Sequence, residues 1–136
     1  MAGKKNIPTG VGYVDGYVIP LRKGNVEQYR KSAEIACKVW LEYGALSYTE
    51  TVGDDLEPGF GRPFPALTGI EETDTVIFAF VGYRDRAHRD EVNAKVLEDD
   101  RIKEMCPENN PGFQPGFDPK LMSFGGFTVL VNGEKN

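Results

Sequence analysis

The sequence predicts an α+β domain in which a four-stranded antiparallel sheet carries two helices on one face. Residues 13–51 and 75–131 each show the pattern of a strand, a helix and a further strand, and the resulting order βαββαβ suits such a sheet. The two strands of the second half are apolar on both sides, although two helices cover only one side of a sheet. We therefore expect something else to cover the second face.

The first half begins with a strand expected over residues 13–20, whose side chains alternate between two faces. Apolar residues at helical spacing then predict a helix over residues 26–43. Asn25, with Gln28 three residues later, has the pattern of an N-terminal capping box, and a glycine stands where a left-handed residue ends a helix. A second strand is expected over residues 45–52.

The second half repeats this order with longer apolar runs. A strand is expected over residues 75–83 and a helix over residues 86–98, with Asp85 as its N-cap. A short helical turn around residues 101–105 follows, and residues 121–131 form the final strand. This order completes the ferredoxin-like arrangement.

Two segments rich in proline and glycine, residues 56–73 and 107–120, are predicted as loops. A connection as long as the first of them often covers a binding site, but a plain surface excursion is an equally good interpretation. Gly125 and Gly126 lie inside the final strand, where paired glycines indicate a bulge or a close approach of neighbouring atoms.

Length and composition indicate one domain over residues 13–131, with terminal tails at 1–12 and 132–136. The 136 residues, 40% of them apolar, match a single domain with a modest core. No apolar run approaches the roughly 20 residues that span a bilayer, and the N-terminal residues lack the apolar stretch of a signal peptide. With two cysteines far apart, the simplest expectation is a reduced, cytoplasmic protein with no membrane partner.

The charge balance argues against a general nucleic-acid binder. The chain has a formal net charge of −5, and its basic clusters are short. Binding phosphates requires clustered lysine and arginine, so we expect no nucleic-acid partner.

A second copy of the chain is the simplest cover for the exposed sheet face. A two-fold partner buries the same apolar patch on both subunits at once. The sequence therefore predicts a homodimer whose sheets face each other, a dimeric α/β barrel.

Several segments together resemble one known family. They are Tyr13–Pro20, Lys38–Leu46, Val52–Asp55, Arg86–Val96 and Phe124–Phe127. On these residues the chain is similar to the YbaA-like family, domain of unknown function 1428. The resemblance implies the dimeric α/β-barrel superfamily, which also holds cofactor-free monooxygenases, heme-degrading enzymes and stress-related dimers. It implies no assigned activity.

His88 is the only histidine, which limits the sites that it can form. One histidine and two distant cysteines cannot supply the four ligands of structural zinc. An all-carboxylate metal site from Asp54, Asp55 and Glu57 is left open beside the simpler interpretation of a solvated turn. In the first turn of its helix a neutral His88 is suited to proton transfer, but it is also suited to anchoring the helix start.

Asp15 is the second candidate catalytic residue, because it lies on a strand with little access to water and needs a partner. It is expected to be either a pocket acid or a structural ion pair. The candidate ligand-binding residues are Trp40, Asn93, Tyr17 and Phe80, for a cavity between the sheet and the helices; Tyr48 and Phe78 belong to the same aromatic set, which also suits a plain core.

No cofactor is expected, because the sequence contains no phosphate loop and no flavin or nicotinamide fingerprint. The leading hypothesis is a homodimer that binds a small molecule, with an oxidation or isomerisation of that molecule suggested by the fold alone. The alternative is a non-enzymatic structural or partner-binding dimer. Heme binding through His88 is a third hypothesis, which requires a large apolar cavity beside the imidazole.

Overall fold

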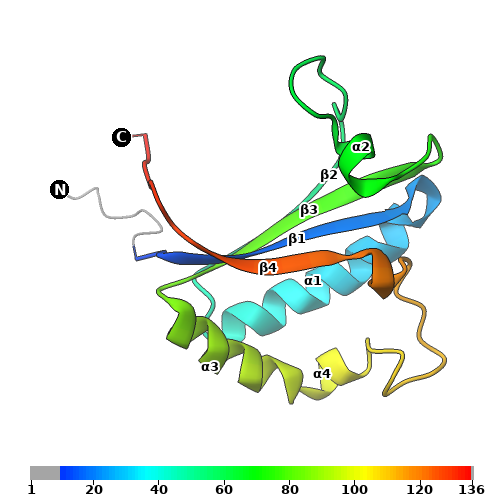
Figure 1. Cartoon of the computed structure of the whole chain (residues 1–136). Coiled ribbons are helices and arrows are strands. Elements are labelled where there is room, and N and C mark those ends of the chain that lie inside the picture. The colour runs from blue at the N-terminus through cyan, green and yellow to red at the C-terminus, as the bar shows by residue number, and fades with distance from the viewer. Residues whose placement is uncertain (1–9, 136) are drawn as a thin grey trace.

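The computed structural model describes residues 10–135, which fold into one sheet with its main helices on a single side (Figure 1). The main elements are β1 (Tyr13–Arg22), α1 (Val26–Glu42), β2 (Ser47–Val52), β3 (Asp74–Tyr83), α3 (Arg86–Leu97) and β4 (Ser123–Thr128). The sheet is antiparallel with the order β2-β3-β1-β4. The predicted ferredoxin-like α+β fold is therefore confirmed, while most of the expected tail 1–12 lies outside the described residues.

Four short elements lie between the main ones: η2 (Lys23–Asn25), α2 (Phe64–Thr68), α4 (Asp100–Lys103) and η3 (Pro119–Leu121). The helix α2 was not expected, because residues 56–73 were predicted as a loop from their prolines and glycines. It begins after Pro63 and ends at Gly69, whose φ is 73°. Proline is tolerated in the first turn of a helix, and glycine readily ends one. Pro63 and Gly69 therefore mark the two ends of a helix here.

The register of β1 with its neighbours determines which side chains share a face. Asp15 pairs with Val81 on β3 and with Gly126 on β4, and Val81 pairs in turn with Tyr48 on β2. Because side chains alternate along a strand, the odd-numbered residues of β1 and β3 point toward the helices. The even-numbered residues point to the other side.

Two clusters of buried residues lie between the sheet and the helices. The first joins α1 and α3 to the sheet and includes Val39, Tyr83 and Val96, each with 0% exposure. The second lies toward the N-terminal end of α1, around Tyr29 and Ile77. The sequence patterns that predicted α1 and α3 are thus explained by burial of one helix face.

The expected capping box at Asn25 and Gln28 does not form. Asn25 makes no side-chain cap hydrogen bond; its amide instead donates to the Gly116 carbonyl at 2.9 Å, and Gln28 Nε2 donates to the Gln114 carbonyl at 2.6 Å. Both side chains therefore bind the loop of residues 107–120, here called the C-terminal loop, which is a long-range partner that local spacing does not reveal. By contrast, Asp85 caps α3 as predicted, accepting a hydrogen bond from the backbone N–H of His88 at 2.8 Å.

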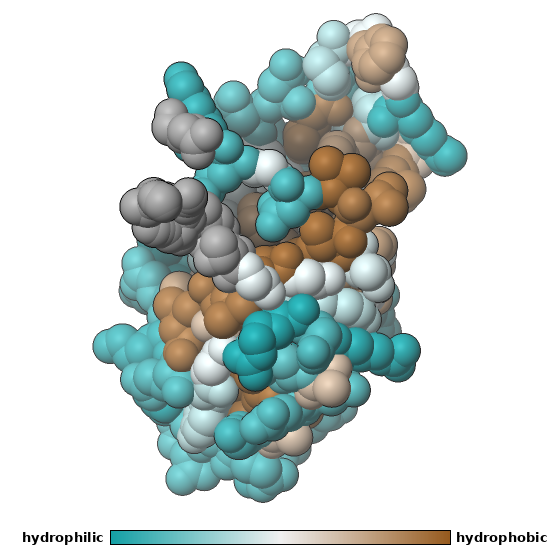
Figure 2. Space-filling view, turned by 90° about the vertical axis from the view of Figure 1, so that its left-hand side faces the viewer, coloured by the Kyte–Doolittle hydropathy of each residue, from teal (hydrophilic) through white to brown (hydrophobic). Residues whose placement is uncertain are grey.

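The sheet face away from α1 and α3 is apolar at its centre. Phe78 and Phe127 lie there with 46% and 62% exposure, and the ring of Phe127 lies across Gly16. Figure 2 shows apolar side chains gathered in its upper half, over the sheet, and a mostly hydrophilic lower half that contains the helices. The prediction that the sheet is apolar on both sides is confirmed in the described residues.

No helix within residues 10–135 combines the length and the hydrophobicity that crossing a membrane requires.

Candidate functional site

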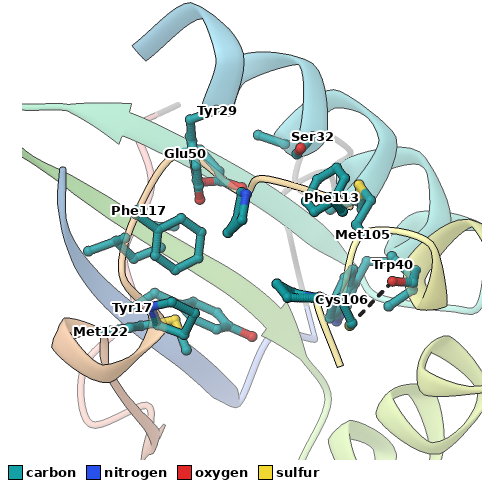
Figure 3. A pocket seen from close by; sticks show the side chains of 18 of the residues that line it. Tyr17, Tyr29, Ser32, Trp40, Glu50, Met105, Cys106, Phe113, Phe117 and Met122 are labelled. Carbon is teal, nitrogen blue, oxygen red and sulfur yellow. Dashed lines mark hydrogen bonds between the residues drawn. The ribbon is translucent and has the colours of Figure 1, made fainter. Parts of the chain in front are cut away.

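A cavity of about 440 Å³ lies between the sheet, α1, α4 and the C-terminal loop (Figure 3). Apolar and aromatic side chains line most of it, and ligand pockets typically have this composition. The sheet contributes Tyr17, Ile19, Tyr48, Glu50, Ala79 and Val81, and the opposite walls include Tyr29, Trp40, Met105, Phe113, Phe117 and Met122.

Small residues on α1 make room for this cavity. Ser32, Ala33 and Ala36 line it from consecutive turns of the helix, and Ala79 lies opposite them on β3. Side chains of this size cannot fill the space between a helix and a sheet. The outer wall is formed by the C-terminal loop, which Asn25 and Gln28 hold against the start of α1.

Glu50 is the charged group that the sheet presents to the cavity. Its two carboxylate oxygens accept hydrogen bonds from the hydroxyls of Tyr29 at 2.5 Å and Tyr48 at 2.6 Å. Burial raises the pKa of both tyrosines, and the neighbouring negative charge of Glu50 raises the pKa of each further. Both phenols therefore remain protonated hydrogen-bond donors.

Within residues 10–135, no lysine, arginine or histidine lines the cavity. Glu108, at its exposed margin, is the second acidic residue of the lining. The ionisable lining within the described part of the chain therefore carries negative charge without a positive partner.

Asp15 has a different environment, although it lies on the same face of the sheet. It is fully buried and forms an ion pair with Arg89 Nη1 on α3 at 2.5 Å. Burial raises the pKa of Asp15, while the Arg89 guanidinium acts in the opposite direction. Arg89 also stacks over the Tyr13 ring, with its Cζ 5.2 Å from the ring centroid. This geometry fits the structural ion pair better than a pocket acid.

Asn93 connects this ion pair to Trp40. Its Nδ2 lies 3.4 Å from Asp15 Oδ2, and its Oδ1 accepts hydrogen bonds from Trp40 Nε1 at 3.1 Å and from the Tyr83 hydroxyl at 3.2 Å. The network therefore joins β1, α1, β3 and α3 behind the cavity wall.

His88 lies in the first turn of α3 with 7% exposure. Its Nδ1 accepts the backbone N–H of Arg84 at 2.9 Å, and its ring packs edge-on against Tyr83. These contacts are the helix-anchoring arrangement that the sequence left open beside a catalytic one. His88 is not among the residues that line the cavity.

The structure brings together only some of the predicted site residues. Trp40 and Tyr17 line the cavity, whereas Asp15 and Asn93 lie in the adjoining network. Phe80 pairs with Gly16 and Thr49 and points to the opposite face of the sheet, so it does not line this cavity. Phe78, the other candidate on this strand, does not line the cavity either, because alternation places Ala79, which lies between them, on the helix-facing side.

Sequence reasoning missed Glu50 and the aromatic residues of the C-terminal loop. Alternation from Tyr48 places Glu50 on the helix-facing side of β2, and a lone charge on that side was a usable signal. No comparable signal marked Phe113 and Phe117, because a long-range loop contact positions them.

Within residues 10–135, no group of three histidine, cysteine, aspartate or glutamate side chains is placed to hold a metal ion. The carboxylate site left open for Asp54, Asp55 and Glu57 is therefore not formed in this structure. Cys37 and Cys106 are free thiols, and Cys106 lies in the cavity wall.

Comparison with known proteins identifies the family of this chain. Residues 12–114 match the family described as "Protein of unknown function (DUF1428)", and the chain belongs to that family. It is 32% identical over 120 residues to the "Uncharacterized protein YbaA" of Escherichia coli (strain K12). The aligned residues cover 88% of this chain and 97% of the relative. The protein of the same description from Shigella flexneri shows the same identity and coverage.

Proposed function

We propose that the protein binds an apolar small molecule in the cavity between the sheet and α1, as part of a homodimer. The observation that supports this proposal is the cavity itself, with its volume of about 440 Å³ and its largely aromatic and aliphatic lining. Packed protein interiors contain few voids larger than a water molecule. An apolar space of this size, with a few polar groups at one side, suits a ligand better than it suits a core.

The proposal is for binding rather than catalysis. Neither His88 nor Asp15 lines the cavity. Nδ1 of His88 accepts a hydrogen bond from the Arg84 backbone, and Asp15 is paired with Arg89. The fold suggested a cofactor-free oxidation or isomerisation, which needs a proton-transfer group beside the ligand. Neither of the two candidate catalytic residues, His88 and Asp15, is in that position. The same separation argues against a heme bound through His88.

The homodimer is proposed from the second face of the sheet. Phe78 and Phe127 are exposed there, flanked by Val14, Val18 and threonines of β2. The centre of this face has no charged residue, and depletion of charge is typical of interface cores. A two-fold partner would bury both copies of this patch.

Binding is tested with the neutral apolar dye N-phenyl-1-naphthylamine, and Trp40 serves as an internal probe. Trp40 is the only tryptophan and lines the cavity. We expect the dye to become fluorescent on binding and to quench the emission of Trp40.

A pair of matched variants locates the dye. Ala36→Phe fills the cavity from α1 and should abolish both signals, whereas Ala94→Phe, at an exposed position of α3, should leave them unchanged. Dye binding that survives Ala36→Phe in a folded protein would contradict the proposed site.

A further inference from the structure

We propose that the ligand of this cavity is an organic cation, an amine with an apolar body, and that Glu50 is its counter-ion. This inference rests on the proposed function of the same cavity. It concerns the charge of the ligand, which the cavity's size and hydrophobicity do not determine.

The first support is the contrast between two acidic residues on the same face of the sheet. Asp15 is paired with Arg89, whereas the hydrogen-bond partners of Glu50 are the neutral hydroxyls of Tyr29 and Tyr48. Asp15 is fully buried and Glu50 is half-buried, and a carboxylate that loses water gains from compensation of its charge. Among the described residues, the chain supplies a guanidinium for Asp15 and hydroxyls for Glu50.

The hydrogen-bonding capacity of Glu50 is also incomplete. A carboxylate has about four acceptor positions, and the two tyrosines use one on each oxygen. The remaining positions suit a donor from a ligand in the cavity. Because the tyrosine hydroxyls donate to Glu50, they also hold its oxygens in place beside the cavity.

The second support is the aromatic lining. Tyr17, Tyr29, Trp40, Tyr48 and Phe117 surround the same space. Figure 3 shows Glu50 next to Tyr29, with Phe117 and Tyr17 below them. Aromatic faces attract cations, tryptophan and tyrosine most strongly. The ionisable acids of this aromatic enclosure are Glu50 and, at its exposed margin, Glu108, and no basic residue of the described chain lines it. Such a lining favours an ammonium group and disfavours a carboxylate or phosphate.

The negative charge of Glu50 also acts on its neighbours. Burial is the main cause of the raised pKa of Tyr17, and Glu50 is one of the charges that raise it further. Burial likewise raises the pKa of the Cys37 thiol, with Glu50 as the second cause. A ligand cation would therefore enter a region of negative potential.

The experiment uses three probes with one apolar body: 4-phenylbutylamine, 4-phenylbutan-1-ol and 4-phenylbutanoate. Their dissociation constants are measured by calorimetry and by the emission of Trp40. We expect the amine to bind about tenfold or more tightly than the alcohol, since hydrogen bonds to charged groups are the strong ones. The carboxylate should bind most weakly.

Glu50→Gln should reduce the preference for the amine to about twofold or less, with the alcohol bound as in the wild type. The matched control is Glu34→Gln, which removes the same charge from an exposed position of α1 and should keep the preference. This control separates the effect of Glu50 from the net charge of −5.

Two results would overturn the inference: an alcohol that binds the wild type as tightly as the amine, or a preference that persists in Glu50→Gln. The first needs no variant, so the proposal is testable even if Glu50→Gln does not fold. If none of the three probes binds, the proposed function fails, and this outcome differs from binding without charge preference.

Discussion

Trp40 donates its indole N–H to Oδ1 of Asn93 at 3.1 Å, while its ring lines the cavity. One side chain therefore connects the cavity to the buried network of Asp15 and Arg89. The predicted site residues fall into two groups, one on each side of this hydrogen bond. Trp40 and Tyr17 lie on the cavity side, and Asp15 and Asn93 lie on the network side.

The buried ion pair should contribute more to stability than the exposed one made by the same arginine. Arg89 contacts Asp15, which is fully buried, and Asp90, whose side chain is 61% exposed. Asp15→Asn should lower the free energy of unfolding by about 3 kcal/mol, because the Arg89 guanidinium loses its buried partner and keeps only the exposed one. Asp90→Asn, the matched control, should cost less than about 1 kcal/mol. Urea unfolding measures both, and equal effects would contradict the structural role given to Asp15.

Asp99 should contribute a pH-dependent part of the stability. Hydrogen bonds from Arg101, with a further one from Tyr43, hold the pKa of Asp99 well below its ordinary value of 3.8. A carboxyl group with a lower pKa in the folded state stabilises the fold above the unfolded value, and this contribution is lost as the pH falls through the folded pKa. Asp99→Asn should therefore be less stable than the wild type near neutral pH, with a difference that shrinks as the pH falls below 3.8.

Thermal unfolding of both proteins across this pH range measures the effect of Asp99. Asparagine also serves as an N-cap, so the start of α4 is preserved in the variant. Asp100→Asn, at the exposed neighbouring position, is the control and should follow the wild type. A difference between wild type and Asp99→Asn that stays constant with pH would contradict the assignment.

The proposed homodimer predicts that charge on the outer sheet face separates the subunits. Phe78→Glu places a carboxylate at the centre of that face and should convert the protein to a monomer, because an unpaired charge in an interface core is costly. Phe60→Glu makes the same change at a loop residue that is 91% exposed and should leave the dimer intact. Sedimentation equilibrium gives the masses. A monomeric wild type would remove the dimer from the proposal.

His88 should support stability rather than ligand binding. His88→Ala removes the acceptor of the Arg84 backbone N–H and the contact with Tyr83, which should lower the free energy of unfolding by about 1–3 kcal/mol. The dissociation constant of the neutral dye should not change, because His88 does not line the cavity. Loss of dye binding in a folded His88→Ala would restore His88 as a site residue.

The sequence by itself determined the elements whose patterns are local. Alternation predicted β1, an apolar run predicted β3, and helical spacing predicted α1 and α3. Asp85 was correctly identified as a cap. These features depend on residues a few positions apart, and their burial follows from the same periodicities. The two-sided hydrophobicity of the sheet was determined in the same way.

Only the tertiary structure decided which charged and polar side chains come together. Arg89 pairs with Asp15, which lies 74 residues away in the sequence. Asn25 and Gln28 bind the C-terminal loop instead of capping α1. These contacts depend on how α3 and the loop pack onto the sheet, which no local spacing encodes. The cavity and the isolated charge of Glu50 inside it result from that packing.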